Sequence, residues 1–247
     1  MRIPKTHMPQ KSFWPAITSS ALRDVFLMGL LTFLFVYTYF IYLVRVGFAE
    51  KISRDVSPER MNRFLLAQLI VMLAVCLICS AVGFFFSRRY GLAGLGDFQS
   101  LKKSLPWIFG IVAVGAPAAF FLYDRSFHVL APGYYPTKWT WALAVAFSTA
   151  FSGEIIARFG MMTIFMGIFR NFKLANIAQS LFVTALAIRS LYLADHPFGL
   201  NYITMIGLVF SFAGSLAAGW IYYRYGILSV ILCHFLFELR ILAFVRF

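Results

Sequence analysis

The chain has 247 residues, of which 61% are hydrophobic, 19% are aromatic and only 13% are charged. No soluble domain of this size needs so much apolar surface, and several apolar runs reach the roughly 20 residues that cross a bilayer. Because the ~10-residue alternating segments of a membrane barrel are missing, we predict an all-α polytopic membrane protein.

The formal net charge of +13 comes from 22 basic and 9 acidic residues. In a soluble protein this balance would suggest a nucleic-acid partner. Here the basic residues lie mainly in short segments between apolar runs, which indicates membrane topology and contact with anionic lipid headgroups. We therefore expect membrane lipid as a partner and no nucleic acid. The cysteines Cys76, Cys79 and Cys233 lie in apolar runs and predict neither a disulfide framework nor a metal site.

A polar, basic tail over 1–24 precedes a single predicted transmembrane domain over 25–247. The predicted spans are 25–44, 64–86, 105–123, 139–169, 174–194, 202–223 and 227–247. Seven spans place the two ends of the chain on opposite sides. Outside the spans, with the N-terminal tail included, eleven Lys and Arg residues lie on the side of the N-terminus and seven on the other. This bias favours a cytoplasmic N-terminus.

Two spans contain residues that disturb a regular helix. In the third span, Pro106 lies near the expected helix start, where proline is tolerated, whereas Pro117 should kink the helix. The fourth span would be about 46 Å long at ~1.5 Å per residue, which exceeds the ~30 Å hydrocarbon core. It must therefore tilt, protrude or break, and Gly153 and Gly160 are the expected places for a break or a close helix approach. A break would give eight spans and would invert the membrane orientation of every later segment.

Acids and bases inside the spans gather in the C-terminal half of the chain. They are Glu154, Arg158, Arg189, His234, Glu238 and Arg240. Glu154 and Arg158 are four residues apart, as are His234 and Glu238, so each pair shares a helix face. Because an isolated charge in the membrane is costly, such residues face the bundle interior and indicate a functional site.

These residues allow two interpretations. In the first, Glu154 is a general base, His234 positions a water or a divalent metal, and Glu238 orients the histidine. In the second, the residues form a structural ion-pair network in which Arg158 and two further arginines, Arg189 and Arg240, neutralise the two glutamates. The residue types alone favour the network.

The C-terminal half resembles the CPBP family of CAAX-protease and bacteriocin-processing membrane proteins, also called Abi proteins, which is similar to the type 2 CAAX prenyl protease. The family pattern is Glu-Glu-x-x-x-Arg, then Phe-x-x-x-His, then His-x-x-x-Asn. The segment 153–158 resembles the first motif, 182–186 lies where the second belongs, and 234–238 is similar to the third. The resemblance covers about 139–240 and implies a CPBP-like helical bundle, intramembrane endopeptidase chemistry and a bacterial cytoplasmic membrane.

The departures from the family pattern concern its reactive groups. Gly153 replaces the glutamate taken to activate water, Leu186 replaces the second histidine, and Glu238 replaces the asparagine. Glycine cannot abstract a proton, and leucine can hold neither metal nor water. We therefore expect the fold to be kept and the peptidase activity to be lost.

The expected function is that of a non-catalytic scaffold or accessory subunit of a membrane complex, with membrane-protein partner subunits and no cofactor. One alternative is an active intramembrane endopeptidase with Glu154 as base and His234 holding water or a divalent metal. Another is a proton relay or transporter. The candidate catalytic residues are Glu154, Arg158 and His234, which match the family pattern, and Glu238, which pairs with His234 on one helix face. The candidate ion-pair partners are Arg189 and Arg240.

Overall fold

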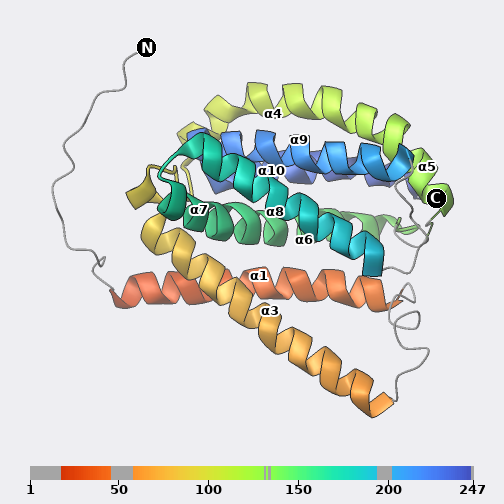
Figure 1. Ribbon diagram of the computed structural model, residues 1–247, viewed down its shortest axis with the longest axis horizontal. Coiled ribbons are helices and arrows are strands. Elements are labelled where there is room, and N and C mark those ends of the chain that lie inside the picture. The colour runs from red at the N-terminus through yellow and green to blue at the C-terminus, as the bar shows by residue number, and fades with distance from the viewer. Residues whose placement is uncertain (1–17, 46–57, 131, 133–134, 194–201, 246–247) are drawn as a thin grey trace.

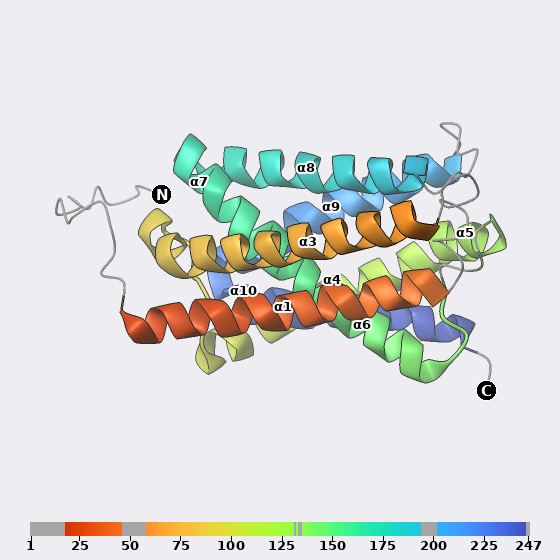
Figure 2. The same cartoon turned by 90° about the horizontal axis from the view of Figure 1, so that it is seen from below.

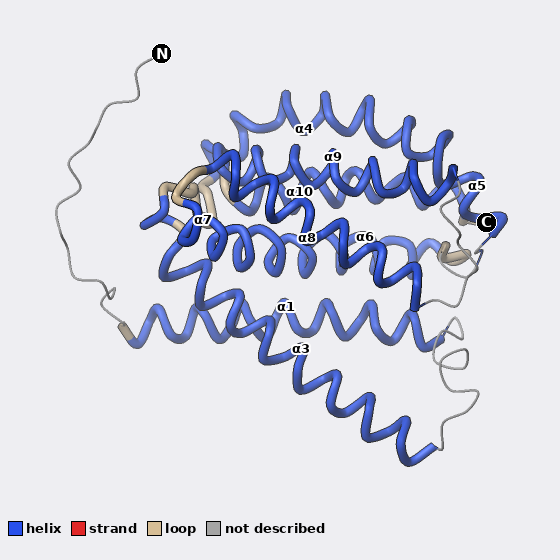
Figure 3. The backbone as a smooth tube through the Cα atoms, viewed as in Figure 1, coloured by secondary structure: helices blue, strands red, loops and turns tan. Residues whose placement is uncertain are grey.

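The computed structural model describes residues 18–45, 58–130, 132, 135–193 and 202–245, and of 43–45, 58–62, 64–65, 130 and 189–193 only the backbone. Within these ranges all regular structure is helical, as Figure 3 shows. The long helices are α1 (Ser19–Arg45), α3 (Pro58–Phe86), α4 (Phe98–Ala119), α6 (Trp139–Glu154), α8 (Phe172–Leu193), α9 (Tyr202–Tyr225) and α10 (Ile227–Glu238). Short helical segments are η1 (Arg88–Tyr90), η2 (Phe120–Asp124), α5 (Arg125–Leu130), η4 (Ile155–Met162), α7 (Thr163–Phe169) and η5 (Leu239–Phe244).

The helices run roughly along the long axis of the molecule. Helices α1 and α3 lie on one side, α4 lies on the opposite side, and the other long helices lie between them (Figures 1 and 2). The first half of α3 inclines away from the rest of the bundle (Figure 1). The start of α1 and the end of η5 lie at opposite ends of the molecule, as seven passes require.

The described helices are those of a polytopic membrane protein. Six candidate spans are long and apolar enough to cross a bilayer: Ser19–Tyr42, Leu66–Phe86, Phe98–Val129, Trp139–Phe169, Tyr202–Tyr225 and Ile227–Phe244. The remaining pass, α8, is apolar over the shorter stretch Phe172–Ile188. The predicted all-α membrane fold is therefore confirmed, with seven long helices in the described part of the chain, six of which are candidate spans.

The long fourth span does not break. It is helical from Trp139 to Phe169 and passes through a π-helix, η4, at its centre. A π-helical stretch has a wider turn than an α-helix, and it changes which side chains face each neighbouring helix. The helix is thus continuous while the facing residues shift, and the break that would have given an eighth span is absent from this described stretch.

The two glycines of this span have different roles. A Cβ built on Gly160 would lie 2.5 Å from the Cβ of Cys79, so this glycine lets η4 approach α3 closely, as predicted. A Cβ on Gly153 would meet only the Cε1 of His234, at 3.9 Å. The expected close approach is therefore wrong at Gly153, where the missing side chain instead leaves room beside a histidine.

Helix α4 begins earlier than the hydropathy suggested. It starts at Phe98 rather than at residue 105, because the carboxylate of Asp97 accepts a hydrogen bond of 2.7 Å from the Ser100 amide and caps the helix. Pro106 therefore lies inside the helix rather than near its start. The helix therefore extends beyond its apolar run because Asp97 caps it.

The same helix also continues past its predicted end. After Pro117 it passes through the π-helix η2 and then becomes α5, so residues 124–130 are helical rather than loop. The proline thus coincides with a change of helix type, where the sequence predicted a kink. This continuation keeps Asp124 inside the bundle, buried at 2% exposure.

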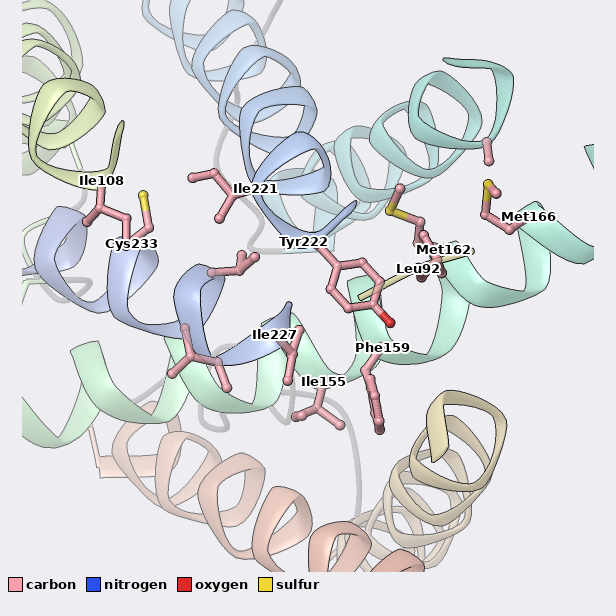
Figure 4. Close-up of a cluster of buried hydrophobic side chains, with 13 residues drawn as sticks. Leu92, Ile108, Ile155, Phe159, Met162, Met166, Ile221, Tyr222, Ile227 and Cys233 are labelled. Carbon is pink, nitrogen blue, oxygen red and sulfur yellow. The ribbon is translucent and has the colours of Figure 1, made fainter. Parts of the chain in front are cut away.

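A cluster of buried side chains from η4, α9 and α10 forms the larger core (Figure 4). It includes Ile155, Phe159, Tyr222 and Ile227, each exposed by 1% or less. Because lipid tails are as apolar as these side chains, helices in a membrane are held by close packing rather than by exclusion of water. This packing fixes η4 against α10 and so sets the positions of the charged residues on both.

Candidate functional site

The first pair of the site links the end of α6 to η4. Glu154 and Arg158 are buried, with side-chain exposures of 2% and 5%, and Oε2 of the glutamate lies 3.2 Å from Nε of the arginine. Nη2 of Arg158 donates to the backbone oxygen and to Oγ of Ser215, at 3.2 and 2.9 Å. The predicted pairing four residues apart is therefore present, and Arg158 also ties η4 to α9.

His234 brings α10 into the same cluster. Its Nδ1 lies 2.6 Å from Oε1 of Glu154, and its Nε2 lies 3.7 Å from Oε1 of Glu238. The imidazole is thus held between two carboxylates, one on each side of the ring. Oε1 of Glu154 is thus hydrogen-bonded to the histidine, whereas Oε2 lies within ion-pair distance of the arginine without forming a hydrogen bond.

Arg240 continues the network away from Glu154. Its Nη1 lies 3.0 Å from Oε1 of Glu238, and its Nε lies 2.7 Å from Oδ2 of Asp124. The hydroxyl of Tyr135 donates to Oδ1 of Asp124 at 2.9 Å. Burial and the neighbouring carboxylate raise the pKa of Tyr135 well above its usual value of 10.0, so the hydroxyl stays protonated and can donate.

The charges of this network come close to cancelling. Three carboxylates, those of Asp124, Glu154 and Glu238, face two guanidinium groups and one imidazole. The six groups are neutral together when the imidazole carries a proton, and paired charge is how a bilayer interior tolerates such residues. The predicted ion-pair role of Arg240 is therefore observed. The side chain of Arg189 lies outside the described residues, so its pairing stays a prediction.

A cavity of about 380 Å³ lies against the network. Glu154, Arg158, His234, Glu238 and Arg240 form its polar wall. Small residues of α9 form much of another wall, namely Gly207, Ser211, Gly214, Ser215, Ala217 and Ala218. The volume is within the range of small-molecule sites, which is roughly 300–1,000 Å³.

Helix α8 presents apolar side chains to this cavity. Val183 and Ala187 line it, whereas Leu186, at the second histidine position of the family pattern, does not and is 42% exposed. Phe182 of the same motif packs its ring at 6.5 Å from that of Phe165. Among the described side chains of α8, no acid or histidine lines the cavity, so the second motif brings no reactive group to the site.

The position of the family's water-activating glutamate lies beside the histidine. As the glycine geometry shows, a side chain at Gly153 would point toward Cε1 of His234 and would meet no other atom outside its own helix within 4 Å. The structure thus has room for a carboxylate at this position, but Gly153 has no side chain to fill it.

The donor set does not suit a metal ion. The two nitrogens of His234 face Glu154 and Glu238, and the remaining oxygen of Glu154 faces Arg158. Across the described ranges, no three His, Cys, Asp or Glu side chains are arranged to hold a metal. The divalent metal of the endopeptidase alternative would have to displace Arg158 or rotate His234 out of these contacts.

Residues 135–240 match the family model described as Type II CAAX prenyl endopeptidase Rce1-like. This part of the chain is therefore similar to the Rce1-like endopeptidase domain, which agrees with the resemblance noted in the sequence. It contains Glu154, Arg158, His234, Glu238 and Arg240, and it begins at Tyr135. Comparisons with curated proteins and with solved structures find no match.

The sequence did not predict three residues that complete the polar network. Asp124 and Tyr135 lie between two predicted spans, yet both are buried. Asp124 pairs with Arg240, and Tyr135 donates a hydrogen bond to Asp124. Ser215 was not recognised as the partner of Arg158. The sequence does contain a hint for Asp124. This residue directly follows an apolar run, and the residues after it are compatible with a helix, so a helix through Asp124 could have been predicted.

Proposed function

We propose that this Rce1-like chain is a non-catalytic membrane protein, acting as a scaffold or accessory subunit. The observation that carries the proposal is the environment of Glu154, which is hydrogen-bonded to His234 at 2.6 Å and ion-paired with Arg158 at 3.2 Å. The place where a free carboxylate could act, beside the imidazole, is occupied by Gly153.

The proposal follows from what amide hydrolysis requires. A general base must lie within hydrogen-bond reach of the attacking water and must be free to take its proton. A carboxylate bound to a guanidinium and to an imidazole is a weak candidate, because a proton arriving on it would disrupt both contacts. The imidazole itself is held between Glu154 and Glu238, so the cluster serves as internal support for three helices.

A protein without catalysis acts through what it binds, so we propose membrane-protein partners and no cofactor. We also propose a bacterial cytoplasmic membrane with the N-terminus in the cytoplasm. The orientation is supported by the basic residues at the end of the molecule where α1 begins, because cytoplasmic segments carry an excess of Lys and Arg.

The test is a cleavage assay on full-length protein reconstituted in liposomes, with a prenylated CAAX-type reporter peptide as substrate. We expect no cleavage by the wild type above that of empty liposomes. We further expect Glu154→Gln to lower the thermal unfolding midpoint, because it removes a charge that Arg158 and His234 both use. Cleavage by the wild type that Glu154→Gln or His234→Ala abolishes, in protein that remains folded, would overturn the proposal.

The second candidate function is an intramembrane endopeptidase with a rearranged site. The cavity favours it, because Glu154, His234 and Glu238 all line one wall of a space that could admit a substrate. Introducing Gly153→Glu tests whether the pocket retains catalytic geometry, since the side chain has room beside His234. Gly153→Gln is the matched control, being of similar size but unable to act as a base. Cleavage by the glutamate variant alone indicates that the site has lost only its base. Cleavage of equal, measurable rate by the wild type and both variants, abolished by Glu154→Gln, indicates that Glu154 serves as base.

A further inference from the structure

Exposed cations gather at one end of the molecule, the end where α1 begins and α3 finishes. They are Arg23, Arg88, Arg89, Lys102, Lys103, Arg170, Lys173 and Arg224, and we call this set the basic rim. They come from six helical segments or their ends: α1, η1, α4, α7, α8 and α9. Figure 1 shows that these segments start or finish at the same end of the bundle.

The rim is a continuous surface, because the segments that carry it contact one another. The loop after η1 is pinned to the start of α10, where the amide of Ile227 donates to the oxygen of Gly94 at 3.0 Å and that of Leu228 to the oxygen of Leu95 at 3.3 Å. The ring of Phe172 stacks on that of Tyr223 at 4.2 Å, which joins the start of α8 to the end of α9. These contacts hold together the helix ends that carry the cations.

Further contacts join η1 to α7. A Cβ on Gly167 would lie 3.1 Å from the ring of Tyr90, so the end of α7 packs directly on η1. The turn at Arg170 follows, in the left-handed conformation with φ of 49°, and leads into α8. The rim therefore runs without interruption from η1 through α7 and α8 to α9.

Little negative charge opposes the rim. At this end the described acids are Asp24, which pairs with Arg23 at 3.3 Å, and Asp97, which caps α4. The opposite end differs: its described exposed cations are Arg63, Arg125 and Lys138.

Aromatic side chains lie just inside the rim. The rings of Trp107 and Trp220 meet edge to face at 5.1 Å, and Trp220 also contacts Tyr225 at 6.0 Å. Trp and Tyr are enriched at the level of lipid headgroups, where their apolar rings and polar atoms both find partners. These aromatic residues therefore predict that the rim lies at the level of the lipid headgroups.

We propose that the basic rim binds the headgroups of anionic membrane lipids. The occupant is an anionic phospholipid rather than a nucleic acid, because the cations surround the end of a transmembrane bundle at the level of its aromatic residues. Cationic segments beside membrane helices attract anionic headgroups by an interaction that falls off within the screening length of the solution. This surface is separate from the cavity, and the proposal does not depend on whether the chain is a peptidase.

The experiment titrates full-length protein in neutral detergent with phosphatidylglycerol or phosphatidylcholine and follows the thermal unfolding midpoint. A lipid that binds the folded state raises the midpoint in a concentration-dependent way. We expect phosphatidylglycerol to raise it more than phosphatidylcholine does. The difference should shrink in ~1 M salt, where the screening length falls to about 3 Å.

Two rim variants and one control locate the effect. The first rim variant carries Arg88→Gln, Arg89→Gln, Lys102→Gln and Lys103→Gln, and the second carries Arg170→Gln, Lys173→Gln and Arg224→Gln. The control changes the opposite end, with Arg63→Gln, Arg125→Gln and Lys138→Gln. We expect each rim variant to weaken phosphatidylglycerol binding by at least about tenfold, because each cation near an anionic surface contributes roughly a fivefold factor. The control should bind as the wild type does.

Several outcomes would overturn the proposal. One is that folded rim variants respond to phosphatidylglycerol as the wild type does; another is that the control loses as much binding as they do. A midpoint shift of equal size with inorganic phosphate would indicate a free-anion site, and one with a single-stranded oligonucleotide would indicate a nucleic-acid surface.

Discussion

Asp124→Asn should destabilise the folded protein by about 3 kcal/mol, because it leaves a buried arginine partly unpaired. The Asp124 side chain is 3% exposed and that of Arg240 14%. Removing one partner of a buried ion pair typically costs about 3–5 kcal/mol. The low end applies here, because Arg240 keeps its contacts with Glu238 at 3.0 Å and with the backbone oxygen of Phe237 at 3.1 Å. Asparagine can still accept from Tyr135, so the loss is mainly one of charge.

The other members of the network should follow in a definite order. Arg240→Gln should cost more than Asp124→Asn, about 4–5 kcal/mol, because it leaves both Asp124 and Glu238 without their guanidinium. Tyr135→Phe should cost about 1–2 kcal/mol, the loss of one buried hydrogen bond. The double variant of Asp124 and Arg240 should be less unstable than the sum of the two single variants, with a coupling of roughly 1–3 kcal/mol.

The assay is reversible unfolding in mixed micelles with increasing dodecyl sulfate, followed by circular dichroism. Arg125→Gln is the matched control, because this neighbouring arginine is exposed, and it should change stability by no more than about 0.5 kcal/mol. The reasoning is refuted if Asp124→Asn costs no more than this control. It is also refuted if the effects of Asp124→Asn and Arg240→Gln add without coupling, since the two side chains would then not be interacting.

Two further predictions concern the backbone and a helix cap. Gly160→Ala should cost about 1–3 kcal/mol, because its methyl group would overlap Cys79, whereas Gly110→Ala has open space and should be neutral or stabilising in the same unfolding assay. The hydrogen bond from the Ser100 amide holds the pKa of Asp97 below its usual 3.8, so the cap stabilises the folded state above that pH. This stabilisation should be lost as the pH falls through the lowered pKa of Asp97. Asp97→Asn should remove this contribution to the pH dependence of the unfolding midpoint. An unchanged pH profile in the variant would show that Asp97 does not cap the helix in this way.

The sequence alone was sufficient for the features that depend on local spacing. Hydropathy and length predicted helical passes, because a bilayer requires a minimum run of apolar residues whatever their neighbours. The spacing of four between Glu154 and Arg158, and between His234 and Glu238, predicted two pairs, because the helix itself places such residues on one face. Both pairs are present, at 3.2 and 3.7 Å.

Tertiary structure decided which groups from distant segments meet. Asp124 reaches Arg240 across 116 positions only because α4 continues through a π-helix, and hydropathy does not register such a change of helix type. Packing also decided that α8 turns Val183 and Ala187 toward the cavity rather than Leu186, and that Gly153 faces His234. Helix rotation is determined by contacts with neighbours, so a motif written along one helix does not reveal which of its residues line the site.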